Sequence, residues 1–210
     1  SDKTVLENKI NFIHQNKDFY FGLTPSVYEN MNVQGHLKYE YLLPLTVEKN
    51  IMTSEKYGFL DLRSNVELRN YDTNKQTNFL VNSFNWKSNK WLSSLGVETY
   101  VQGLIKNVNY DAKKTKEYKN DKENSELHSA LGYFAKFALY KEDFINKNLY
   151  SLTPKFLLRY APGHMRNVEK SASLKYGNLF NLNKIDKFDI LEPGLSTSIG
   201  FEYKKNKLNE

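Results

Sequence analysis

Side chains capable of acid–base or metal chemistry are common in this chain, but they form no catalytic arrangement. The four histidines, His14, His36, His128 and His164, are widely separated, and none belongs to an HExxH sequence. We therefore predict no metal site. The absence of cysteine excludes disulfide bonds, thiolate–zinc sites and a cysteine nucleophile. No GxSxG, GxGxxG or P-loop sequence occurs either, so we expect neither an enzyme nor a cofactor.

Charged residues of opposite sign share the polar faces of the predicted elements. Glu40, Asp61 and Glu67 alternate with Lys38, Arg63 and Arg69. Opposite charges on one face neutralise each other, so this arrangement favours a hydrated surface over acid–base catalysis. The segment 111–126 (DAKKTKEYKNDKENSE) mixes lysines with acids in the same way and is predicted to be a solvated loop. The net charge of +6 therefore does not predict a nucleic-acid partner.

The elements that position these residues are predicted to be strands, because apolar and polar side chains alternate in steps of two. From 36 to 48, for example, Leu37, Tyr39 and Tyr41 fall on one face, and Lys38 and Glu40 on the other. The same alternation is found at 19–27, 60–69, 91–105, 127–139, 150–160 and 195–203. Short polar stretches between these runs predict hairpin turns at 15–18, 30–35, 71–75 and 87–90.

The length of these runs indicates the class of protein. Alternation persists for about 10 to 13 residues, whereas a strand of a soluble protein has about 5 or 6. A tilted strand needs about 9 to 11 residues to cross a bilayer. No apolar stretch approaches the roughly 20 residues of a membrane-spanning helix. We predict an all-β fold, an antiparallel meander of about eight to ten long strands that is a partial segment of a transmembrane β-barrel.

In a membrane barrel the apolar faces contact lipid and the polar faces line a hydrated lumen. Aromatic residues near strand ends should then lie at the two water interfaces: Tyr20, Tyr57, Trp86, Trp91, Tyr110, Tyr140 and Tyr150. The residues predicted to face the lumen are Lys38, Glu40, Asp61, Arg63, Glu67, Arg69, Lys155 and Arg159. The pattern leaves open another outer-membrane barrel, such as a porin or receptor, and a soluble β-rich binding protein.

Three prolines lie inside the alternating runs, at Pro25, Pro44 and Pro154. Because proline cannot donate a hydrogen bond to a neighbouring strand, it is usually excluded from the centre of a sheet. Two interpretations remain open. Either these prolines occupy edge positions or bulges, or they weaken strand pairing so that the sheet can open.

The C-terminal third carries three sequence motifs. The first lies in LYSLTPKFLLRYAPG at 149–163 and contains Pro154, Arg159, Tyr160 and Pro162. The second, YGNLFNLNKI at 176–185, contains Asn178, Leu179, Phe180 and Asn183, and the third, DILEPGLSTSIGFEY at 189–203, contains Glu192 and Gly194. With GHLKYEYLLPLTV at 35–47, these stretches resemble the barrel of the outer-membrane lipopolysaccharide-assembly protein family LptD, also called organic solvent tolerance protein.

The resemblance covers roughly residues 18 to 204 and implies that 1–210 belongs to one barrel domain, without the family's periplasmic N-terminal domain and remaining strands. It implies an outer-membrane translocon of a Gram-negative bacterium that inserts lipopolysaccharide into the outer leaflet. The implied partners are lipopolysaccharide, a plug lipoprotein, the periplasmic bridge proteins of the transport system and outer-membrane lipid. The lateral exit of the family, between its first and last strands, is expected to lie outside this segment.

Overall fold

The chain folds as one antiparallel sheet of thirteen strands, seen in a computed structural model that describes residues 5–71, 75–116, 118, 123–143, 145–163, 176–185 and 187–207. Helical structure in these ranges is limited to two 3-10 turns, Gly35–Lys38 and Tyr176–Asn178. Within the same ranges no helix is both long and apolar enough to span a membrane. The predicted all-β class and the antiparallel meander are confirmed.

Seven strands have 13 to 17 residues each and form most of the sheet: β5 (Tyr39–Ser54), β6 (Gly58–Tyr71), β7 (Lys75–Lys87), β9 (Val97–Lys113), β10 (Asn124–Phe137), β12 (Asn148–Ala161) and β13 (Gly194–Lys207). The shorter strands are β1 (Val5–Lys9), β2 (Phe12–Gln15), β3 (Phe19–Leu23), β4 (Ser26–Asn30), β8 (Trp91–Leu92) and β11 (Leu139–Asp143). Each long strand pairs with the next long strand along the chain.

Interrupted strands explain why the count of thirteen exceeds the predicted eight to ten. β3 and β4 both pair with β5. On their other side, β2 pairs with β3 and β1 pairs with β4. β10 and β11 likewise both pair with β12. Each of these three pairs, β1 with β2, β3 with β4 and β10 with β11, follows the path of a single long strand that is broken once.

The prolines lie at these interruptions. The carbonyl of Pro44, in β5, accepts a hydrogen bond of 3.1 Å from the backbone nitrogen of Thr24, between β3 and β4. Since the nitrogen and oxygen of one strand residue point to the same side, the proline nitrogen faces the break. Pro25 lies in that same break, and Pro154 lies between the parts of β12 that pair with β10 and with β11. These prolines therefore lie at breaks between neighbouring strand segments, where no backbone donor is needed.

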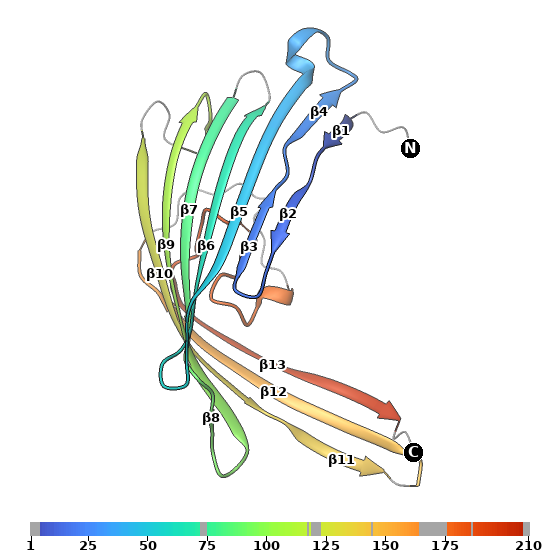
Figure 1. Cartoon of the computed structure of the whole chain (residues 1–210). Helices are drawn as coiled ribbons and strands as arrows, with labels where there is room; N and C mark the ends of the chain where they lie inside the picture. The colour runs from blue at the N-terminus through green and yellow to red at the C-terminus, as the bar shows by residue number, and fades with distance from the viewer. Residues whose placement is uncertain are drawn as a thin grey trace.

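The sheet is strongly curved but not closed (Figure 1). β13 pairs with β12 alone, and at the other end β1 and β2 pair only with β4 and β3. The described residues form an open sheet with two edges, so the structure does not show the barrel of which a partial segment was predicted.

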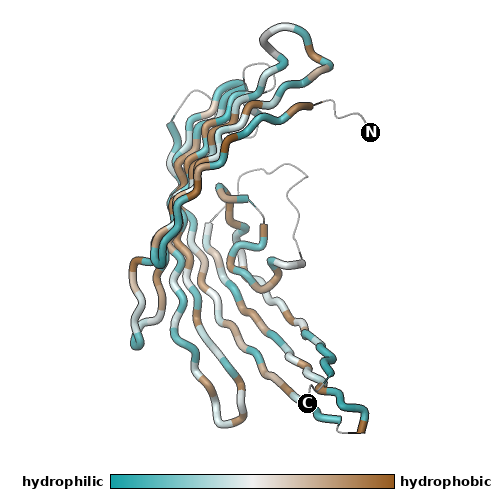
Figure 2. The backbone as a smooth tube through the Cα atoms, turned by 45° about the vertical axis from the view of Figure 1, so that its right-hand side comes forward, coloured by the Kyte–Doolittle hydropathy of each residue, from teal (hydrophilic) through white to brown (hydrophobic). Residues whose placement is uncertain are grey.

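A segment of irregular structure lies in the hollow of the sheet (Figures 1 and 2). We call residues 176–185 and 187–193 the strap, and the sheet surface beneath it the concave face. The strap contributes Leu182, Ile185, Ile190 and Leu191 to the buried core. Strands β7, β9, β10 and β12 supply the remaining core residues, in three clusters on the concave face. The core thus lies between strap and sheet, and not between two sheets.

Some strand boundaries differ from those predicted. Residues 35–38 form a 3-10 turn, so the strand predicted from 36 begins at Tyr39. The run predicted at 91–105 is a hairpin, because Gly96, with φ of +82°, reverses the chain between β8 and β9. β1, β2 and β7 were not predicted.

Candidate functional site on the concave face

Most of the charged residues predicted to face a lumen share the concave face. The strand register aligns Arg63 of β6 with Glu48 of β5, and Arg69 with Leu42, on the same side of the sheet as Asp61 and Glu67. Arg63 lies 3.3 Å from Glu48, and Arg69 lies 3.4 Å from Glu40. The expected pairing of opposite charges is therefore present, and its members remain accessible to water.

Lys155 and Lys38 occupy different surroundings. Lys155, on β12, donates a 2.7 Å hydrogen bond to Glu202 of β13. Lys38 does not lie on a strand face, because it ends the 3-10 turn before β5. Its ammonium group donates to Glu29 at 2.7 Å, and this hydrogen bond raises the pKa of Lys38. Lys38 is thus a turn residue, contrary to its predicted position in a strand.

Arg159 differs most from its predicted role. Its side chain is 0% exposed, because the strap covers this part of β12. The guanidinium donates through Nε to the carbonyl of Leu182 at 2.5 Å and through Nη2 to the carbonyl of Glu192 at 2.6 Å. The Glu192 carboxylate lies 3.8 Å from Nη2. Arg159 therefore anchors the strap at two points, Leu182 and Glu192, and does not line open space.

Further polar contacts attach the strap to the sheet. Lys106 of β9, only 3% exposed, donates a 3.0 Å hydrogen bond to the carbonyl of Ile190. The Ser198 hydroxyl of β13 donates to the carbonyl of Leu179 at 2.6 Å. Lys184 donates its backbone N–H to the Glu192 carboxylate and its ammonium group to Ser196. Burial lowers the pKa of Lys184, and the nearby Arg159 charge acts in the same direction.

Two glycines of the sheet make room for the apolar side chains of the strap. A Cβ atom on Gly132 of β10 would lie 2.6 Å from Cδ2 of Leu182, and one on Gly200 of β13 would lie 3.1 Å from Cζ of Phe180. Farther along the strap, Phe188 packs edge to face on Phe79, with ring centroids 5.6 Å apart. The fit of strap and sheet thus depends on small residues at particular positions.

The three C-terminal motifs meet at this site, although Arg159 and Glu192 are 33 positions apart in the sequence. Arg159 comes from the first motif, Leu179, Phe180 and Asn183 from the second, and Glu192 from the third. Pro154 and Tyr160 of the first motif lie on the opposite, convex face, in the register of Phe201 and Leu195. The residues of the resemblance therefore include the contacts that hold the strap.

No family model matches this chain, and a search of curated proteins returned no match.

The aromatic residues predicted for the water interfaces differ in exposure, and Tyr20, Trp86 and Tyr150 are half-buried. Tyr57, Trp91 and Tyr140 are exposed near strand ends. Tyr110, in contrast, is 4% exposed and packs against Phe79 and Tyr118 beneath the strap. Tyr110 is therefore a core residue, a position that no sequence pattern indicated.

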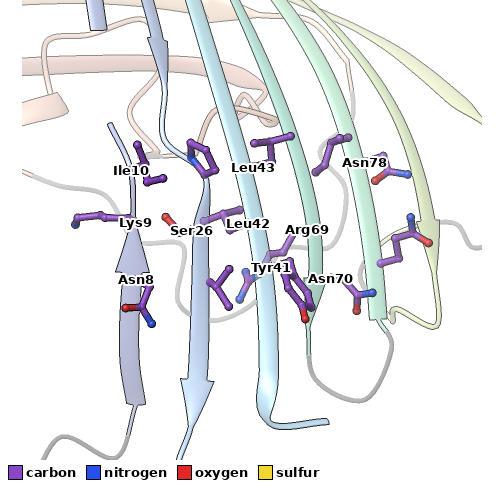
Figure 3. Close-up of a pocket in the computed structure, with 14 residues that line it drawn as sticks. Asn8, Lys9, Ile10, Ser26, Tyr41, Leu42, Leu43, Arg69, Asn70 and Asn78 are labelled. Atoms are coloured by element: carbon purple, nitrogen blue, oxygen red, sulfur yellow. The ribbon is translucent and has the colours of Figure 1, made fainter. Parts of the chain in front are cut away.

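A pocket lies near the N-terminal edge of the sheet, at the break between β3 and β4 (Figure 3). Its volume is about 610 Å³, and its lining is contributed by β1, β4, β5, β6 and β7. Ile10, Leu42 and Leu43 supply apolar surface, and Lys9 and Arg69 supply charge. Arg69 is already paired with Glu40 and lies over the ring of Tyr71. The pocket follows from the strand break at Pro25.

Sequence reasoning missed Lys106 as a functional residue. The alternation placed it on the polar face, but its charge alone did not distinguish it from other exposed lysines. The available signal was its position in a strand whose same-face neighbours are apolar, since Leu104 and Val108 are both buried. A lysine whose same-face neighbours are buried is itself expected to be buried. A buried ammonium group requires a hydrogen-bond or ion-pair partner.

Proposed function

We propose that the chain forms part of the wall of an outer-membrane β-barrel of the lipopolysaccharide-assembly type, with its concave face toward a hydrated lumen. The observation that carries the proposal is the convex face. On β13 alone Leu195, Ile199 and Phe201 are 71%, 81% and 70% exposed. Exposed large apolar residues continue on the same side of β12, β10 and β9, as Leu158, Leu131 and Ile105.

A lipid environment accounts for this surface more simply than water does. Soluble monomers rarely expose contiguous apolar patches above a few hundred Å². Strands of 13 to 17 residues also exceed the 9 to 11 needed to cross a bilayer with tilt. The sequence resemblance supports lipopolysaccharide as the cargo, and the outer membrane of a Gram-negative bacterium as the location. Transport of this kind requires no bond chemistry in this segment.

A matched pair of isoleucine substitutions tests the membrane environment. Ile199→Arg places a charge on the convex face of β13, and we expect it to destabilise the membrane-inserted protein by about 2 to 4 kcal/mol. Ile145→Arg changes a residue that is 94% exposed in the turn before β12, and we expect no effect. Stability is measured by urea unfolding in lipid vesicles. Equal stability of both variants, or a parent protein that is fully soluble without detergent, would contradict the membrane assignment.

Depletion of the full-length protein in its host tests the cargo. We expect newly made lipopolysaccharide to disappear from the cell surface and to accumulate inside, as measured by surface labelling and fractionation. Re-expression of the wild-type protein should restore surface labelling. Normal surface lipopolysaccharide together with lost solute uptake would instead identify a porin or receptor.

A further inference from the structure

A polar cavity lies between the strap and the concave face, separate from the contacts of Arg159. Its volume is about 450 Å³, and β6, β7 and β9 form its wall while the strap forms its cover. None of the described residues that line it is acidic. Three are cationic: Arg63, Lys106 and Lys187.

Two of these three charges have no carboxylate partner. Arg63 lies 3.3 Å from Glu48. Neither Lys106 nor Lys187, in contrast, has an acidic oxygen within 4.0 Å among the described residues. Lys106 uses one of its three donors on the carbonyl of Ile190, so two donors remain for a ligand. Positive charge without an adjacent carboxylate attracts an anion.

The strap carboxylates are engaged elsewhere. The hydroxyl of Tyr118 donates to Asp189 at 3.3 Å, and Glu192 accepts the backbone N–H of Lys184. Neither Asp189 nor Glu192 lines the cavity. Among the described residues of the lining, an anion in the cavity would therefore not meet a carboxylate.

The amide of Asn183 indicates a second property of the ligand. Its Nδ2 atom donates to the carbonyl of Lys187 at 3.2 Å, which fixes the orientation of the amide. Its Oδ1 atom is then buried and accepts no hydrogen bond in the described part of the chain. Because a buried acceptor without a donor is unfavourable, a ligand hydroxyl at this position would be stabilising. Asn65, Asn85 and Asn178 add further amides to the lining.

We propose that this cavity is a binding site for a phosphate ester of a polyol, a ligand that carries both an anionic group and hydroxyl groups. The phosphate lies between Lys106 and Lys187, and a hydroxyl donates to Asn183. Because Lys106 belongs to the sheet and Lys187 and Asn183 belong to the strap, the ligand connects the two. This assignment does not depend on the membrane function proposed above.

Calorimetric titration of the purified chain with glucose 6-phosphate, inorganic phosphate and glucose tests the site. We expect glucose 6-phosphate to bind more tightly than phosphate, and glucose not to bind. Lys187→Gln should weaken binding of glucose 6-phosphate about tenfold or more, since a charge-assisted contact is lost, whereas Lys187→Arg should retain most of it. Lys116 is an exposed lysine outside the cavity. Lys116→Gln removes the same charge as Lys187→Gln and is the matched control, and it should bind glucose 6-phosphate as the wild type does.

Several results would overturn the assignment. Absence of binding, or equal weakening by Lys187→Gln and Lys116→Gln, would exclude a specific anion site. Equal affinity for phosphate and glucose 6-phosphate would exclude the hydroxyl contact. Limited proteolysis of the strap in each variant, without ligand, shows whether the strap remains docked. A second series with phosphatidylglycerol micelles distinguishes a lipid headgroup from a soluble ester as the natural ligand. Displacement of glucose 6-phosphate by the micelles would indicate a lipid headgroup, and its retention would indicate a soluble ester. Both outcomes agree with a phosphate-ester site.

Discussion

Replacing Gly58 with alanine is expected to destabilise the chain by about 2 to 5 kcal/mol. Gly58 begins β6 with φ of +85°, a conformation that costs other residues about 1 to 2 kcal/mol. An added Cβ would also lie 2.1 Å from the backbone oxygen of Lys87. Because that oxygen belongs to the main chain, the strands themselves must shift, which adds about 1 to 3 kcal/mol.

Gly35→Ala is the matched control for this prediction. Gly35 has φ of +76°, but nothing lies within 4 Å of its added Cβ, so only the conformational cost applies. Urea unfolding followed by tryptophan fluorescence measures both variants. Trp86 is a suitable reporter, because its Nε1 donates to the carbonyl of Tyr57, next to Gly58, at 2.8 Å. Equal unfolding free energies for the two variants would refute the steric argument.

Arg159→Ala is expected to cost about 3 to 5 kcal/mol and to release the strap. The substitution removes the donors to the carbonyls of Leu182 and Glu192 and leaves the Glu192 charge without its buried partner, a loss typically of this size. We expect protease cleavage within 176–193 to accelerate at urea concentrations that do not unfold the sheet. Arg159→Lys retains the positive charge and a hydrogen-bond donor. It should therefore recover part of the strap's resistance to protease.

Arg69→Ala serves as the control for Arg159→Ala. Arg69 also lies on the concave face and has an ion pair with Glu40, but its side chain is 42% exposed. Surface pairs contribute about 0 to 1 kcal/mol. A similar loss of strap protection in both variants would show that Arg159 is not its specific anchor.

The sequence predicted strands well where only one face is apolar. β6 alternates cleanly, because its concave face carries the polar residues Asp61, Arg63, Asn65 and Glu67, none of which is fully buried. β7 was missed for the opposite reason. Phe79 and Val81 on its concave face are buried by the strap, while Leu80 and Phe84 occupy the convex face, so apolar side chains appear on both sides. Alternation fails wherever a second layer covers the polar face.

The tertiary contacts of the strap could not be predicted from the sequence. The family resemblance placed Arg159, Asn183 and Glu192 in separate motifs, but no local rule brings residues of three segments to one point. The cavity is a similar case. Lys187 was one lysine among many, and only the fold brings it to the lining of the same cavity as Lys106.

The strap also constrains the order of folding. Lys106 and Ile190, joined by a hydrogen bond, are 84 positions apart in the sequence, and closing such a long loop is entropically costly. The docking surface of the strap combines β7, β9, β10, β12 and β13, and β13 is synthesised after the strap itself. We therefore expect strap docking to be a late step. Until then Arg159 and Lys106 stay hydrated, and the sheet must reach nearly its full width by pairing of neighbouring strands alone.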